Sequence, residues 1–161
     1  MTESFSQIEQ DAWGGFLRTY AQINRLVEED LQECARLTHI EFEVLLRLSW
    51  AESQRLRVQD LAAQSILTRS GVSRVVERLE KAGLVTRESA SEDRRGAYAV
   101  LTEAGAERFR TAADAHMAYV RRIFLGLFTE DELKQMAAFW RRVEERPAES
   151  TRAQLGCKIK D

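Results

Sequence analysis

The segment Val58–Thr102 limits the fold more than any other part of this 161-residue chain, because it contains two short helix patterns in direct succession. The first predicted helix covers Val58–Gln64. The second begins after Thr68, a residue type that caps helix N-termini, and runs to Ala82. Gly83 then supplies the left-handed residue on which helices commonly end. We expect the second helix to bury one stripe of apolar side chains: Val72, Val75, Val76 and Leu79.

Two strand patterns follow this helix pair. Leu84–Glu88 and Ala97–Leu101 contain β-branched and aromatic residues in partial alternation, and the polar segment Ser89–Gly96 lies between them. This pattern predicts a β-hairpin whose loop carries arginines. A helix pair followed by such a hairpin is the way in which a winged helix-turn-helix meets DNA. One helix enters the major groove, and the wing reaches the phosphates and the neighbouring minor groove.

Arginine and hydroxyl side chains occupy the side of the second predicted helix opposite its apolar stripe. Arginine is the commonest direct reader of guanine, and serines near a helix N-terminus can donate to phosphate. Arg78 could instead pair with Glu77 or Glu80, and Arg87 on the first wing strand could pair only with Glu88. The candidate DNA contacts are Thr68, Arg69, Ser70, Ser73, Arg74, Arg78 and Arg87, together with Arg94 and Arg95 at the hairpin tip, which suit a narrow minor groove.

The charge of the chain is distributed unevenly. The net charge is −2 overall, yet residues 55–95 carry +3, while residues 1–54 carry −6 and residues 96–161 carry +1. The positive excess therefore coincides with the segment expected to touch phosphate, as in other nucleic-acid-binding surfaces. The acidic N-terminal third would keep DNA away from the wrong face.

Long helix patterns precede the central segment. Within Trp13–Cys34 the apolar residues recur at steps of three and four, which predicts about six turns of helix. Thr38 and Glu41 fit a capping box that starts a second helix, which ends near Trp50–Ser53. Its expected buried residues are Phe42, Leu45, Leu46 and Leu48 or Ser49.

Two more helices are predicted after the hairpin. One opens at Thr102–Glu103 and carries an apolar face over Phe109–Leu127. The other starts at a second capping box, Thr129–Glu132, and ends at Pro147, the only proline of the chain. The predicted fold is therefore mainly α with a small β-hairpin wing, a winged helix-turn-helix between long helices.

Three stretches of the sequence resemble the MarR (multiple antibiotic resistance regulator) family of bacterial transcription factors. They are LTHIEFEVLLRL from Leu37, RSGVSRVVERLEKAGLVTRE from Arg69, and EDRRGAYAVLTEAG, which ends at Gly105. The wing of this family carries an Asp-x-Arg pair, found here as Asp93 and Arg95. The resemblance implies that Arg95 enters the minor groove and that Asp93 braces it through a charge-assisted hydrogen bond.

The resemblance also implies a homodimer with two winged helix-turn-helix lobes, bound to double-stranded DNA at a pseudo-palindromic operator. Such proteins are usually repressors that leave their operator when a small molecule or an oxidant acts. Residues 1–36 would form an N-terminal dimerisation helix, 37–102 the DNA-binding domain, 103–147 the C-terminal dimerisation helices and 148–161 a mobile tail. The alternatives are an activator without a ligand, and a winged helix that serves as a protein-interaction module.

Members of the family often bind aromatic carboxylates or phenols in a cleft between the dimerisation helices and the DNA-binding lobe. Aromatic walls with one polar group would suit such a ligand. The alternative is that aromatic residues at helical spacing belong to the core, and that His39, inside a capping box, is exposed to solvent. The candidate effector contacts are Trp13, Phe16, Tyr20, His39 and Trp50.

Other functional classes lack their signatures in this sequence. There is no phosphate-binding glycine loop, nucleophile elbow or histidine-rich cluster, so we expect neither an enzyme nor a cofactor. The two histidines and two cysteines are too scattered for a metal site. Cys34 ends the first predicted helix, whereas the family's peroxide-sensing cysteine lies near the start of it. We therefore expect no redox role for Cys34 or Cys157.

The sequence also gives no sign of a membrane or secretory protein. No apolar run approaches the ~20 residues that cross a bilayer, and the acidic N-terminus lacks the pattern of a signal peptide. We therefore expect a cytoplasmic protein with no membrane partner.

Overall fold

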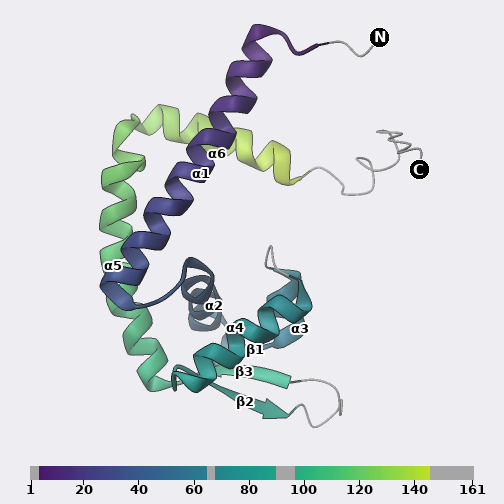
Figure 1. Ribbon diagram of the computed structural model, residues 1–161, viewed down its shortest axis with the longest axis vertical. Helices are drawn as coiled ribbons and strands as arrows, with labels where there is room; N and C mark the ends of the chain where they lie inside the picture. The colour runs from purple at the N-terminus through teal and green to yellow at the C-terminus, as the bar shows by residue number, and fades with distance from the viewer. Residues whose placement is uncertain (1–3, 65–67, 90–96, 146–161) are drawn as a thin grey trace, which may run out of the picture. The chain divides into compact units, whose positions relative to one another are not determined.

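The structure is a computed structural model that describes residues 4–64, 68–89 and 97–145 (Figure 1). The chain divides into two compact units, 1–120 and 121–161. The first unit contains most of the helices and a three-stranded antiparallel sheet, so the predicted fold class is confirmed. Among the described helices, none combines the length and the apolarity that a membrane span requires.

Helix α1 (Gln7–Ala35) begins six residues before Trp13, where the apolar pattern starts. The cause is a capping box in the polar N-terminal stretch. The Ser6 hydroxyl accepts from the Glu9 backbone N–H, and the Glu9 carboxylate accepts from the Ser6 N–H at 2.8 Å. Only three residues of α1 are buried within the chain, and all lie toward its C-terminus: Val27, Leu31 and Ala35.

Helix α2 (His39–Trp50) starts at the predicted capping box and ends within the predicted range. One predicted core position is wrong: Val44 is buried, whereas Leu46 is only half-buried. The reason is that α2 packs against α1, α4 and β3, so its buried surface is wider than one stripe. The other predicted core positions are confirmed for Phe42, Leu45 and Leu48.

The wing sheet has three strands, one more than the sequence predicted. Strand β3 (Ala97–Leu101) is central, with β2 (Val85–Ser89) on one side and β1 (Arg55–Arg57) on the other, all antiparallel. The missed strand follows a short 3-10 turn, η1 (Glu52–Gln54). Its sequence, Arg-Leu-Arg, is too short for alternation to predict a strand. It becomes one because β3 offers an edge with which it can pair.

Helices α3 (Val58–Ala63) and α4 (Arg69–Lys81) form the helix pair that the sequence predicted. Thr68 caps α4, since its hydroxyl accepts from the Gly71 N–H at 3.2 Å. Gly83 has a φ of 72°, which is the left-handed conformation expected at this stop. The predicted apolar stripe of α4 is buried throughout: Val72, Val75, Val76 and Leu79.

Helix α5 (Glu103–Ile123) is shorter than predicted, because Gly126 interrupts the pattern and a 3-10 turn, η2 (Leu125–Leu127), follows. The boundary between the two compact units falls inside α5. In the second unit, α6 (Glu130–Glu144) starts at the predicted capping box of Thr129. Pro147, expected to end it, lies outside the described residues.

Phe42 lies in the core of the first unit where α2 meets α5. Its ring centroid is 5.4 Å from that of Phe109 and 4.9 Å from that of His116. Aromatic contacts at these distances stabilise beyond the area that they bury. Leu45 of α2 and Val76 of α4 have no exposed surface. This core holds α4 in a fixed orientation, so its polar face points outward.

Gly105 offers a test of the contact between α5 and the start of β2. A Cβ atom at Gly105 would overlap the carbonyl oxygen of Leu84. Gly105→Ala should therefore lower the free energy of unfolding by about 1–3 kcal/mol, because backbone atoms must move. Urea unfolding followed by circular dichroism measures this change.

The matched control is Gly15→Ala in α1, where an added Cβ meets nothing within 4 Å. Alanine in the middle of a helix should raise the free energy of unfolding there by about 0.5–1 kcal/mol. Wild-type stability in the Gly105→Ala protein would contradict the tight contact.

Candidate nucleic-acid interface

The outer face of α4 carries the polar side chains that the sequence nominated. Arg69, Ser70 and Arg74 are exposed, and Ser73 is half-buried. The hydroxyl oxygens of Thr68 and Ser70 lie 3.1 Å apart at the N-terminus of the helix. Over the described residues, Arg69 and Arg74 make no ion pair. Their guanidinium groups are therefore available to a ligand outside the chain.

Arg78 is tied to another helix. Its Nε donates to Oε1 of Glu41 at 2.9 Å, which joins α4 to the first turn of α2. The alternative pairing with Glu77 or Glu80 is wrong. Glu77 accepts from Lys81 at 2.8 Å, and Glu80 lies 3.4 Å from Arg87. Arg78 therefore positions α4, while about half of its side chain stays exposed.

Glu41 is at once the capping residue of α2 and the partner of Arg78. Burial raises the pKa of this carboxyl, but the backbone hydrogen bond from Thr38 and the contact with Arg78 outweigh burial. The pKa of Glu41 therefore lies below its ordinary value. The ionised form fits this place, and it supports the helix start and the α2–α4 contact together.

Arg87 connects the wing to α4. It donates to the backbone carbonyl of Ser73 at 2.8 Å and lies 3.4 Å from the carboxylate of Glu80. The alternative pairing with Glu88 is wrong, because Glu88 lies 3.6 Å from Arg55 on β1. Strand pairing separates the neighbours Arg87 and Glu88, since adjacent side chains of a strand point to opposite faces.

Strand β1 supplies two arginines that the sequence interpretation missed. The Arg55 guanidinium lies 4.1 Å from the centre of the Tyr98 ring, and that of Arg57 lies 5.3 Å from it. Arg57 Nε also donates to the Tyr98 hydroxyl at 3.1 Å. The positive charge of residues 55–95 was visible in the sequence. The sequence did not indicate that these two arginines lie beside the other candidate contacts, because strand β1 was not predicted.

Three arginines from different elements surround one small hollow of about 110 Å³. They are Arg57 of β1, Arg69 of α4 and Arg87 of β2. None of the described residues that line the hollow is acidic. The remaining lining residues are Val58, Gln59, Ser73 and Ala97.

The hairpin tip lies outside the described residues. The expected contacts of Asp93, Arg94 and Arg95 therefore stay predictions. The strands on either side, β2 and β3, pair in a regular antiparallel register from Val85↔Leu101 to Ser89↔Ala97. That register agrees with the predicted hairpin.

A second, larger hollow of about 560 Å³ lies between α1, α2 and α3. It brings together two of the five predicted effector contacts, Tyr20 and His39. Trp13 and Phe16 are not among its lining residues, and Trp50 is 77% exposed at the end of α2. The sequence did not nominate its other lining residues, which are Asn24, Glu28, Ile40, Glu43, Arg47, Ala63 and Gln64.

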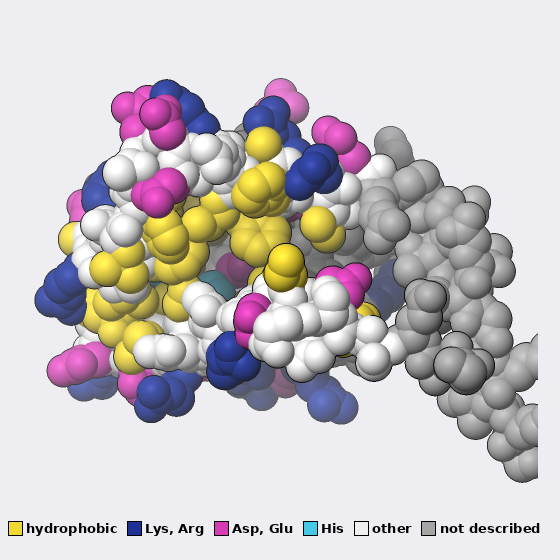
Figure 2. All heavy atoms as spheres, turned by 90° about the horizontal axis from the view of Figure 1, so that it is seen from above, with side chains coloured by type: hydrophobic (Ala, Val, Ile, Leu, Met, Phe, Trp, Pro, Cys, Tyr) yellow, Lys and Arg dark blue, Asp and Glu magenta, His cyan; other side chains and the backbone are white. Residues whose placement is uncertain are grey.

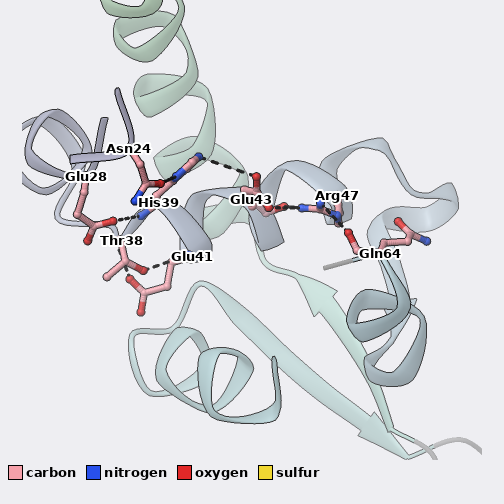
Figure 3. Close-up of polar contacts among 8 residues, drawn as sticks. All are labelled: Asn24, Glu28, Thr38, His39, Glu41, Glu43, Arg47 and Gln64. Carbon is pink, nitrogen blue, oxygen red and sulfur yellow. Dashed lines mark hydrogen bonds and ion pairs between the residues drawn. The ribbon is translucent and has the colours of Figure 1, made fainter. Parts of the chain in front are cut away.

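A chain of polar contacts runs along this hollow from α1 to α3 (Figure 3). His39 Nδ1 lies 3.2 Å from Oδ1 of Asn24, and its Nε2 lies 3.9 Å from Glu43. Arg47 donates to Glu43 at 2.9 Å and to the carbonyl of Gln64 at 2.9 Å. The idea that His39 is merely solvent-exposed is wrong, because its ring is half-buried within this chain of contacts.

The environment of Cys34 does not favour a reactive thiolate. Partial burial and the negative charge of Asp30 raise the pKa of its thiol. Across residues 4–64, 68–89 and 97–145, no group of three or more histidine, cysteine, aspartate or glutamate side chains could hold a metal ion. Cys157 lies outside these ranges.

Known proteins share this arrangement over most of their length. The crystal structure of AbsC, a MarR family transcriptional regulator from Streptomyces coelicolor, is 37% identical in sequence, with a TM-score of 0.84 over 95% of this chain and 100% of that one. The sequence profile of the MarR family matches residues 37–96. The chain belongs to the MarR family. The resemblance noted in the sequence is therefore confirmed.

Two further transcriptional regulators extend this comparison. The MarR family regulator Sco3205 from Streptomyces coelicolor, solved in complex with DNA, is 32% identical, with a TM-score of 0.87 over 91% of this chain and 94% of that one. The Escherichia coli helix-turn-helix transcriptional regulator PrsX is 30% identical over 68% of this chain and 67% of its own. This MarR protein is accordingly a DNA-binding transcriptional regulator and not an enzyme.

The depressed pKa of Glu41 predicts a loss of stability in acid. A carboxyl whose pKa is lower in the folded state stabilises the fold above its unfolded pKa, and that contribution disappears as the pH falls through the folded pKa. The free energy of unfolding of the wild type should therefore begin to fall below about pH 4.5, the ordinary value. Glu41→Gln should flatten this dependence, and near neutral pH it should cost about 1 kcal/mol.

Urea unfolding at a series of pH values measures the effect. Glu52→Gln serves as the control, since Glu52 is an exposed carboxyl in η1. If the free energy of unfolding falls with pH as steeply in Glu41→Gln as in Glu52→Gln, the assigned role of Glu41 is contradicted.

Proposed function

We propose that this MarR protein is a homodimeric repressor that binds a pseudo-palindromic operator and leaves it when a small phenolic ligand binds. The observation that carries the DNA-reading role is the pair Arg69 and Arg74. Both are exposed on the outer face of α4 and make no ion pair over the described residues. Arg78 is tied to a carboxylate, and Arg87 is tied to a backbone carbonyl. Since the chromosome is its target, we place the protein in the cytoplasm.

Direct reading of base pairs suits α4. Arginine can donate two hydrogen bonds to guanine in the major groove, and the hydroxyls of Thr68, Ser70 and Ser73 can position the helix against phosphate. Arg78 and Arg87 would act mainly by holding this helix in place. Arg95, braced by Asp93, would enter the minor groove as the family pattern implies.

A homodimer is supported by the exposed apolar side of α1. Trp13, Phe16 and Tyr20 stack in series, with ring centroids 5.8 and 6.2 Å apart, yet 55%, 41% and 55% of these residues are exposed. Figure 2 shows hydrophobic side chains that reach the molecular surface in the view from above. Exposed apolar patches of this kind mark interaction sites. A second copy is the partner that the family implies, so sedimentation should give twice the chain mass of 18.5 kDa.

The hollow between α1, α2 and α3 is the proposed effector site. Its volume of about 560 Å³ lies in the range of small-molecule pockets. Tyr20 supplies an aromatic wall, and Glu28 and Glu43 add two carboxylates to the lining, of which Glu43 is paired with Arg47. An anionic ligand is disfavoured beside these carboxylates. A neutral phenol can stack on Tyr20 and donate a hydrogen bond from its hydroxyl group to a carboxylate. A structurally similar organohalide-sensing regulator has been solved with 2,4-dichlorophenol bound, although it is only 17% identical.

Occupation of this hollow would reach the DNA-binding helices through Arg47. A phenol that binds Glu43 competes with Arg47, which also holds the carbonyl of Gln64 at the end of α3. Release of that carbonyl removes a contact between α2 and the C-terminal end of α3. The factor by which the ligand lowers DNA affinity is set by its preference for the altered arrangement over the DNA-binding one. Because the coupling is reciprocal, DNA lowers the affinity for the ligand by the same factor.

The DNA-reading role predicts a specific defect for Arg74→Ala. Loss of a bidentate contact to guanine costs about 1–3 kcal/mol of discrimination, which is roughly a five- to 150-fold weaker preference for the operator. Fluorescence anisotropy measures binding to the DNA upstream of the protein's own gene, with unrelated DNA as competitor. Arg25→Ala, which removes an exposed arginine of α1, is the control. If Arg74→Ala binds the operator as tightly and selectively as wild type, α4 does not read bases through this arginine.

The effector role predicts that phenols stabilise the protein and weaken its binding to DNA. A phenol that binds the folded state raises the melting temperature by mass action. Ile40→Trp should fill the hollow and abolish both responses, because Ile40 lines it. Trp50→Ala, at an exposed position outside the hollow, should preserve both. A phenol response that survives Ile40→Trp would place the effector elsewhere.

A further inference from the structure

The hollow beside α4 brings together arginine side chains from three different elements. Arg57, Arg69 and Arg87 converge on a space of about 110 Å³, and none of its described lining residues is acidic. Glu80 lies beside Arg87 but is not part of the lining. Guanidinium groups from three elements that face one small space suit an anionic ligand, because each of them attracts it.

Tyr98 orients the arginine that the sequence did not nominate. Its hydroxyl accepts from Arg57 Nε at 3.1 Å, and Arg55 lies over its ring at 4.1 Å. A guanidinium fixed through Nε keeps its terminal N–H groups directed away from that contact. Arg87 is fixed in a similar way by the carbonyl of Ser73. Two of the three arginines are therefore oriented in advance, which lowers the entropy that a ligand must overcome.

The shape and chemistry of the hollow suit a phosphate group. Its volume corresponds to roughly a few water molecules, enough for one small tetrahedral anion. Arginine forks match phosphate oxygens, and Ser73 and Gln59 add polar side chains to the wall. Arg69 also belongs to the exposed face of α4, so an anion in the hollow lies beside the proposed base-reading surface.

We propose that this hollow binds one phosphate of the DNA backbone, with Arg57 as a direct contact and Tyr98 as its positioning residue. The inference rests on the DNA-binding role of this face and extends it from α4 and the wing tip to strand β1. A phosphate held between β1, α4 and β2 fixes the register of α4 in the groove without reading sequence.

Salt dependence tests the proposal directly. Each phosphate neutralised on double-stranded DNA contributes about 0.9 to the slope of log affinity against log salt. Arg57→Gln should therefore reduce that slope by about 0.9 and weaken binding roughly five- to tenfold near 0.1 M salt. The loss should be equal for the operator and for a duplex of unrelated sequence. Arg57→Lys, which keeps the charge, should keep the slope.

Matched variants separate this contact from general effects. Arg25→Gln removes one exposed arginine of α1 and should leave the slope unchanged. Tyr98→Phe should weaken DNA binding about two- to threefold in the wild-type background and add nothing in the Arg57→Gln background, because it acts through Arg57. Thermal unfolding confirms that each variant is folded.

Three outcomes overturn the proposal. If folded Arg57→Gln keeps the wild-type slope, the hollow does not hold a DNA phosphate, although the proposed regulator stands. If Arg25→Gln lowers the slope equally, the effect is one of net charge. If inorganic phosphate raises the melting temperature of wild type but not of Arg57→Gln, while the DNA slope is unchanged, the hollow binds free anions instead. A wild type that binds no DNA at any salt concentration would overturn the proposed function as well.

Discussion

Burial of the valine stripe of α4 is the constraint on which the rest of this structure depends. Val72 and Val76 have no exposed surface, and α4 packs against α2 and β2 through this side. Because an α-helix is rigid, fixing one side fixes the direction of every residue on the other. Arg69, Ser70 and Arg74 are exposed for this reason. The proposed DNA interface is thus a consequence of core packing rather than of any contact among its own polar residues.

The arginines of the interface divide into two groups with different physical roles. Arg78 and Arg87 are bound to groups elsewhere in the chain, Glu41 of α2 and the Ser73 carbonyl respectively. They hold α4 against its neighbours. Arg69 and Arg74 make no ion pair over the described residues and remain available to DNA. Another arginine links the proposed effector hollow to α3, because Arg47 donates both to Glu43 and to the carbonyl of Gln64.

Much of the fold could be predicted because its signals are local. The capping boxes at Thr38 and Thr129, the stop at Gly83 and the apolar stripe of α4 involve residues close together along the helix, so the sequence pattern contains them directly. Candidate DNA contacts followed from the same pattern, as the complement of the buried stripe. Of the five effector candidates, Tyr20 and His39 line the proposed effector hollow, whereas Trp13, Phe16 and Trp50 do not. The sequence pattern did not distinguish these two groups. Aromatic spacing on a helix does not tell which neighbour each ring will face.

The sequence by itself determined the order of the helices, the side of α4 that is exposed, and the resemblance to the MarR family. Only the tertiary structure decided the pairing of β1 with β3, the partner of Arg78 and the convergence of three arginines on one hollow. Arg78 and Glu41 are 37 residues apart, and Arg57 and Tyr98 are 41 apart. Contacts within a helix turn are enforced by backbone geometry, and periodicity therefore reveals them. Contacts across such separations exist only after the core has packed, so no local pattern in the chain specifies them.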